Sequence, residues 1–154
     1  MKPLVTTLVR LGKQLSGWAL IPLCALPVQA ETTECGAYTV HHIAVNSTFI
    51  RPEIATQYNI VRAARSAFIN VSVLRKDSDG GTTPVQARIS GGRSNLMQQT
   101  QQIPFVEVRE GAAIYYLGQF DFSNAELLRF RIEVAPEEQA ASCSLDWTTT
   151  LYAG

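Results

Sequence analysis

Histidine is scarce in this 154-residue chain, and its only two copies, His41 and His42, are adjacent. Neighbouring residues of a β-strand point to opposite faces, so the pair cannot easily bind one metal ion from a regular strand. A zinc site needs three or four converging ligands, and the fold would have to bring Glu34 or Asp146 to His41. We therefore predict no metal and no cofactor. A metal-dependent or hydrolytic enzyme that uses His41 is the alternative.

Sequence motifs for catalysis are also missing. No G-x-S-x-G turn is present to expose a nucleophilic serine. The glycine-rich run Ser90-Gly91-Gly92-Arg93-Ser94 lacks the lysine of a phosphate-binding loop, and no helical pattern follows it. We predict a flexible turn at this run and assign no catalytic residue.

The chain lacks a hydrophobic run long enough to span a membrane. Its most apolar stretch, residues 18–28, has about half of the roughly 20 residues that a spanning helix needs, and it contains two prolines. Three basic residues precede this stretch and Val28-Gln29-Ala30 ends it, which is the pattern of a secretory signal peptide. We predict a signal peptide over residues 1–30 with cleavage after Ala30, a single mature domain over residues 31–154, and no stable membrane anchor.

Positive charge is limited once the predicted signal is removed. The signal contains three of the thirteen basic residues and none of the thirteen acidic ones, so the mature domain has a formal charge of −3. Nine of its ten cations are arginines, and Lys76 is the one lysine. A nucleic-acid-binding protein normally has a basic face, and the sequence shows none, so we predict no nucleic-acid partner.

Cysteine occurs three times, and no two copies have the C-x-x-C spacing that lowers a thiol pKa. Cys24 lies within the predicted signal. Its lipidation is a minor alternative, because Leu23 before it is larger than a lipidation signal requires. Cys35 and Cys143 are left in the mature domain, and an even pair in an exported protein predicts a disulfide. This bond would join the first residues of the domain to its last strand.

Alternation of apolar and polar residues dominates the mature chain, and a period of two is typical of half-buried strands. It is clearest over residues 128–134 and 143–151, and the first strand is predicted at residues 38–46. We predict an all-β fold, namely a seven-stranded antiparallel immunoglobulin-like β-sandwich with one short helix, and a small barrel is the competing architecture. The aromatic residues of segment 115–122 and Trp147 could pack in the core or line an exposed surface.

Glycine-containing turns predict two hairpins. Residues 77–81 would connect a strand at 69–73 to one at 85–89, because the glycines can adopt positive φ at little cost. Residues 109–111 would connect the strands on either side of them, and the second of these strands is apolar on both faces, which predicts a central position.

Two segments do not fit the strand pattern. Residues 51–58 are predicted to form the short helix, because Pro52 suits the first turn and Glu53 suits its positive end. Residues 91–102 are polar and rich in glutamine, and we predict an exposed loop there.

Several motifs of the mature chain resemble one known family. They include Val40-His41-His42, Asn46-Ser47-Thr48-Phe49, Pro52-Glu53-Ile54-Ala55, Asn70-Val71-Ser72-Val73, Arg93-Ser94-Asn95-Leu96, Glu107-Val108-Arg109-Glu110-Gly111 and Ala113-Ile114-Tyr115-Tyr116. Over most of residues 38–134 the chain resembles the bacterial exported family filed as domain of unknown function 4426. The resemblance implies a Gram-negative periplasmic protein and supplies no catalytic residues. At Ile43 we expect a polar residue in this family, which weakens any polar cluster around His41.

Five polar residues in the family-like stretches are our candidates for binding: His41, Arg93, Asn95, Glu107 and Arg109. We predict a non-enzymatic binding or interaction module of the periplasm, with a protein or small-molecule partner. Exposed strand edges could recruit another chain by strand addition. A structural or envelope-stress role is a further alternative.

Overall fold

A computed structural model of the chain describes residues 30–138 and 142–154 as one β-rich domain. The predicted signal peptide falls almost entirely on residues 1–29, outside the described residues. The first half contains β1 (Glu31–Cys35), β2 (Tyr38–Asn46), the 3-10 helix η1 (Ser47–Phe49), α1 (Pro52–Gln57), β3 (Ser66–Lys76) and β4 (Thr82–Pro84). The second half contains β5 (Ala87–Ser94), β6 (Thr100–Gln102), β7 (Phe105–Glu110), β8 (Ala113–Asp121), β9 (Glu126–Pro136) and β10 (Cys143–Leu151).

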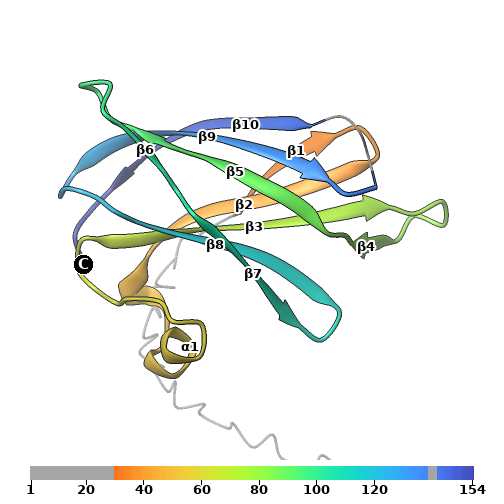
Figure 1. Cartoon of the computed structure of the whole chain (residues 1–154), viewed down its shortest axis with the longest axis horizontal. Coiled ribbons are helices and arrows are strands. Elements are labelled where there is room, and N and C mark those ends of the chain that lie inside the picture. Colours follow the sequence, from red (N-terminus) through yellow and green to blue (C-terminus); the bar gives the residue numbers. More distant parts are fainter. Residues whose placement is uncertain (1–29, 139–141) are drawn as a thin grey trace, which may run out of the picture.

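The strands form two antiparallel sheets that face each other as a β-sandwich (Figure 1). The first sheet has the order β1-β2-β3-β8-β7, with β4 paired to β3, and the second has the order β10-β9-β5-β6. The chain passes from the second sheet to the first between β6 and β7. At this passage Ile103 N–H still donates to Gly91 O at 2.9 Å, and Phe105 already pairs with Gly118 of β8.

The core lies between the two sheets and follows the predicted alternation. Leu128, Phe130, Ile132 and Val134 of β9 are fully buried, and the residues between them face solvent. Phe130 stacks on Trp147 of β10, with ring centroids 4.9 Å apart. The large aromatic side chains that the sequence left unplaced therefore belong mainly to the core and not to an exposed stripe.

The predicted disulfide between Cys35 and Cys143 is present and links β1 of one sheet to β10 of the other. Their Cα atoms are 5.9 Å apart across a sequence separation of 108 residues. The bond therefore links the two sheets at the end of the sandwich where β2 and β10 begin.

The predicted short helix is confirmed as α1, with Pro52 in its first turn and Glu53 beside the positive end of the helix dipole. Asn46 caps the preceding η1 by accepting a hydrogen bond from Thr48 N–H at 3.1 Å. Among residues 30–138 and 142–154, no helix is long and apolar enough to cross a membrane.

The described residues form ten strands where the sequence predicted seven, and one predicted hairpin and one predicted loop differ from the structure. The turn at residues 77–81 connects β3 to the short β4, and β5 then pairs with β9 in the other sheet. Residues 91–102 are not one loop, because Thr100–Gln102 pairs with Gly92–Ser94 as β6. The flexible turn predicted at Ser90–Ser94 is also wrong, because these residues belong to β5 and pair with β9. Strands as short and polar as β1, β4 and β6 pair through their backbone, so no apolar pattern reveals them.

Candidate functional site

The five predicted binding residues lie in three separate places. His41 is on β2 at the outer face of the first sheet, Arg93 and Asn95 are at the end of β5, and Glu107 and Arg109 are on β7. The first sheet's β2 and β7 are separated by β3 and β8. The structure therefore brings Arg93 together with Asn95, and Glu107 together with Arg109, but does not gather all five in one pocket.

The two histidines occupy opposite faces of β2, as expected from a regular strand. His41 is half-buried, and its Nδ1 is 3.0 Å from the Thr32 hydroxyl. His42 is 3% exposed and packs against the Trp147 ring, and its Nε2 is 3.3 Å from the Thr33 hydroxyl. Within the described part of the chain, no three His, Cys, Asp or Glu side chains are grouped so that they could hold a metal ion.

His42 should make stability depend on pH. Its Nδ1 has no hydrogen-bond partner among the described residues, and burial lowers the pKa of His42 below its usual value of 6.5. The unfolded chain then binds a proton before the folded one, so stability is complete above pH 6.5 and falls as the pH drops below it. We expect a slope of at most about 1.4 kcal/mol per pH unit, measured by urea unfolding between neutral and mildly acidic pH. His42→Phe should flatten this slope, and an unchanged slope in the variant would contradict the assignment.

Glu107 and Arg109 belong to a hydrogen-bonded network that joins the two sheets. The Tyr116 hydroxyl donates to Glu107 at 3.0 Å and accepts from Ala87 N–H of β5 at 2.8 Å, and Arg109 Nε donates to Glu107 at 2.7 Å. The bond from Arg109 holds the pKa of the Glu107 carboxyl below its usual value. Burial raises the pKa of Tyr116 to about 12, so its hydroxyl keeps its proton at neutral pH. This network links β5 to β7 and β8, which is a structural role.

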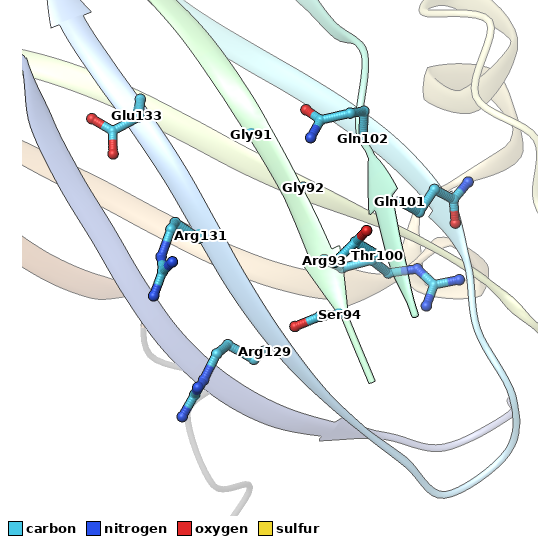
Figure 2. Close-up of a pocket in the computed structure, with 10 residues that line it drawn as sticks. All are labelled: Gly91, Gly92, Arg93, Ser94, Thr100, Gln101, Gln102, Arg129, Arg131 and Glu133. Carbon is cyan, nitrogen blue, oxygen red and sulfur yellow. The ribbon is translucent and has the colours of Figure 1, made fainter. Parts of the chain in front are cut away.

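A hollow of about 380 Å³ lies over β9, β5 and β6 on the second sheet (Figure 2). Its floor includes Gly92, where a Cβ atom would lie 2.1 Å from the carbonyl oxygen of Gln101 on β6, so no side chain fits there. In Figure 2, Arg129 and Arg131 extend from β9 toward β10, where both pair with Asp146 and stay more than 60% exposed. Exposed ion pairs of this kind contribute little, so the two β9 arginines are not a constrained binding group.

Arg93 differs from these arginines because it points into the sandwich. It lies opposite Phe130 in the register of β5 and β9, so the two side chains point to the same face of the sheet. Phe130 is fully buried, so this face is the one that lines the core. Its guanidinium lies 6.0 Å from the centroid of the Phe120 ring, and the side chain is only 14% exposed. Figure 2 shows Arg93 leaving β5 toward Gln101 of β6, in the direction opposite to Arg129 and Arg131.

The guanidinium of Arg93 is incompletely paired. Its Nε is buried without a hydrogen-bond partner among the described residues, and its Nη1 is 3.9 Å from Glu126, which is too far for a hydrogen bond. Glu126 is held elsewhere, because it accepts from Ser123 N–H at 2.6 Å and from the Asn95 amide at 3.3 Å. A buried charged donor without an acceptor is costly, so Arg93 is ready to accept a partner from outside.

These groups line a hollow of about 440 Å³ at the end of the sandwich, which we call the Arg93 pocket. Its lining comprises Arg93, Asn95, Met97, Gln99, Thr100, Gln101, Asp121, Phe122, Ser123 and Glu126. The sequence predicted Arg93 and Asn95 as binding residues but missed Asp121 and Glu126, which lie on either side of the β8–β9 turn. Glu126 comes three residues after Ser123, and this spacing, typical of a capping box, was the sequence feature that could have placed the Glu126 carboxylate at the turn. The turn uses it without forming a helix, because Ala125 has a φ of +56°.

The chain matches the model of one protein family. The family is described as "Domain of unknown function (DUF4426)", and the match covers residues 32–154. No curated protein matches the chain.

Solved structures include similar folds. A crystal structure of a DUF4426 family protein from Pseudomonas aeruginosa is 27% identical with a TM-score of 0.71, covering 81% of this chain and 96% of that one. FetP of uropathogenic Escherichia coli strain F11, recombinantly expressed in the periplasm, is 7% identical with a TM-score of 0.57, covering 80% and 94%. A copper-bound variant of the same FetP is 8% identical with a TM-score of 0.56, covering 80% and 90%. The two FetP structures share the fold with this chain.

Proposed function

The chain belongs to the DUF4426 family, and we propose that it is a periplasmic, non-enzymatic binding module that takes a zwitterionic amino compound, a free amino acid or short peptide, in the Arg93 pocket. The incomplete pairing of the buried Arg93 guanidinium is the observation that carries this proposal. Arginine presents a planar set of donors that matches the two oxygens of a carboxylate. A ligand carboxylate would supply the acceptors that the protein does not.

The charges of the pocket define the rest of the ligand. One guanidinium, from Arg93, faces two carboxyl groups, from Asp121 and Glu126. A simple anion would meet both carboxylates, and like charges at short range are unfavourable. A molecule that has a carboxylate and a cationic amine satisfies both signs. Asn95, Gln99 and Gln101 add amide groups that can donate to and accept from a peptide bond.

Binding is preferred over catalysis because of the kinds of side chain in the pocket. The lining contains neither histidine nor cysteine nor lysine, and these residues most often supply a general base or an activated nucleophile. The likeness to FetP concerns the fold, so the copper of that protein does not enter the proposal.

The periplasmic address in this proposal rests on two supports. The amino-terminal pattern is typical of a cleavable signal, and the Cys35–Cys143 disulfide suits an oxidising compartment.

Titration calorimetry with free amino acids and dipeptides tests the proposal. We expect at least one dipeptide to bind, and we expect Arg93→Met to weaken it by about 30-fold or more, because the variant loses the partner of a desolvated carboxylate. Methionine keeps the apolar contact with Phe120, so the fold should be retained. Arg131→Met, which removes an exposed arginine outside the pocket, is the matched control and should bind normally.

The same titrations can also contradict the proposed ligand class. N-acetylated dipeptides should bind more weakly, because they lack the amine that faces Asp121 and Glu126. If no amino acid or dipeptide binds, or if Arg93→Met and Arg131→Met bind equally, the assignment of the pocket is wrong.

A further inference from the structure

The strand register collects many chain segments at one end of the sandwich. The ends of β2, β5, β8 and β10 lie beside the starts of β3 and β9, through the pairs Asn46↔Ala67, Ser66↔Asp121, Ser94↔Arg129 and Leu151↔Glu126. We call this end, with residues 47–65, 95–99, 122–125 and 152–154 and the adjoining strand termini, the loop end. In Figure 1 the β5–β6 turn, the β8–β9 turn and the carboxyl terminus lie at the left, and α1 lies below the sheets.

Exposed apolar side chains are concentrated at the loop end. Seven large apolar side chains among the described residues are exposed, and six of them lie here: Phe49, Val61, Leu96, Met97, Leu127 and Tyr152. The seventh, Val106, is on the edge strand β7. Single exposed apolar residues are normal on a protein surface, but a concentration of them indicates an interaction site.

The turn between β5 and β6 carries the most exposed pair, Leu96 at 80% and Met97 at 74%. Four backbone N–H groups of this turn are paired within it. Asn95 N–H donates to Gln99 O, Gln98 N–H donates to Asn95 O, and the Asn95 side chain accepts from Met97 N–H at 3.1 Å and from Gln99 N–H at 3.0 Å. Backbone groups that are already paired lose little when water is removed from around them. The turn can therefore place two apolar side chains in a region that water does not reach.

Exposed arginines without a salt bridge are concentrated at the loop end. Among the described residues, four basic side chains form no salt bridge: Arg51, Arg62, Arg65 and Arg88. The first three lie in residues 47–65 and are exposed. The acidic side chains beside them are Glu53 and Glu110, and Glu110 accepts a hydrogen bond from Tyr58. The loop end thus combines exposed apolar side chains with three unpaired arginines.

We propose that the loop end docks reversibly on a bilayer that contains anionic phospholipid. Leu96 and Met97 enter the interface between headgroups and acyl chains, and the exposed Arg51, Arg62 and Arg65 contact the lipid phosphates. A surface that combines exposed apolar side chains with arginine is the composition that binds anionic lipid interfaces. A second copy of the chain is a poorer occupant, because two loop ends face to face would each bring the same three unpaired arginines. Met97 also lines the Arg93 pocket, so dipeptide titration of the Leu96→Ser, Met97→Ser variant distinguishes a loss of docking from a loss of the pocket.

Vesicle co-sedimentation of the purified exported protein tests this docking. We expect binding to vesicles of phosphatidylethanolamine with phosphatidylglycerol, and little binding to phosphatidylcholine vesicles. Salt should weaken it, because the Debye length falls from about 10 Å at 0.1 M to about 3 Å at 1 M. The double variant Leu96→Ser, Met97→Ser should bind about tenfold more weakly or worse, because it loses the inserted apolar surface. Val106→Ser is the matched control, since Val106 is 64% exposed but lies outside the loop end.

Each contrary outcome overturns the docking. Equal binding to both vesicle types would show that anionic lipid does not contribute to docking. Unchanged vesicle binding by the double variant would show that Leu96 and Met97 do not insert. Equal losses in the double variant and in Val106→Ser would show nonspecific adsorption. Size-exclusion chromatography tests whether a second copy of the chain occupies the loop end instead. If the double variant abolishes self-association of a protein that does not bind vesicles, the loop end is a contact between copies of this chain. Thermal unfolding of every variant should match the unmodified protein, because the replaced side chains are exposed.

Discussion

Replacing both Cys35 and Cys143 by serine should lower the free energy of unfolding by about 4 kcal/mol. The two cysteines are 108 residues apart in sequence, and a crosslink over so long a loop removes much of the conformational freedom of the unfolded chain. The folded state also depends on this bond, because β1 is an edge strand that pairs only with β2. Five mostly exposed residues pack little apolar surface, so β1 should detach first once the bond is absent.

Urea unfolding of the oxidised protein, the reduced protein and the double serine variant measures this effect. The reduced protein and the variant should share a lowered midpoint, since both lack the same crosslink. Hydrogen exchange should show the largest loss of protection in β1 and in the start of β10. If the variant unfolds at the midpoint of the oxidised protein, the bond adds no stability and the loop-entropy explanation fails.

The sequence predicted those strands in which buried and exposed side chains alternate. β9 and β10 alternate strictly because one face of each lies in the core, so their extents came close to the observed Glu126–Pro136 and Cys143–Leu151. The short helix was predicted because Pro52 and Glu53 mark its first turn. β6 was missed because its three exposed residues pair with β5 through backbone hydrogen bonds. Hydrogen bonding of this kind leaves no period of two in the residue types.

The sheet to which each strand belongs could not be predicted from neighbouring residues in the sequence. The turn at residues 77–81 forms a hairpin, but with the short β4 and not with the predicted strand at 85–89, because β4 ends after Pro84 and β5 starts in the other sheet. A strand edge in either sheet offers the same donors and acceptors. Packing of Ala87 and Ile89 against the core decides between the two sheets, and such a contact appears only in three dimensions.

The candidate site was accessible from the sequence in part. Arg93 and Asn95 were predicted by the family-like motif that contains them. The inward direction of Arg93 could have been inferred from parity, because residues 87, 89 and 93 lie on one face of a strand. The glycines between them hid this pattern, since Gly91 and Gly92 interrupt the side-chain alternation. Glu126 and Asp121 come from a turn of another strand, and only the pairing of β5 with β9 brings them near Arg93.

Those glycines lead to the second large expected effect. Gly91→Ala should cost about 3 kcal/mol of stability or more, because it combines backbone strain with a steric clash. Gly91 has a φ of +138°, and a Cβ atom there would lie 2.2 Å from the carbonyl oxygen of Arg131 and 2.9 Å from the Cα of Ile132. Both atoms belong to the backbone of β9, which cannot turn aside as a side chain does. The strands β5 and β9 must separate, and Arg93, two residues further on, should lose its position against Phe120.

Gly111→Ala is the matched control for this effect. Gly111 also has a positive φ, +59°, but a Cβ atom there meets nothing within 4 Å. It should cost only the strain of a left-handed residue, about 1–2 kcal/mol. Urea unfolding of both variants separates the two contributions, and near-ultraviolet circular dichroism of Trp147 reports whether the core near β9 has moved. Equal losses in the two variants would show that strain alone explains Gly91, and that β5 and β9 do not need the close approach that shapes the Arg93 pocket.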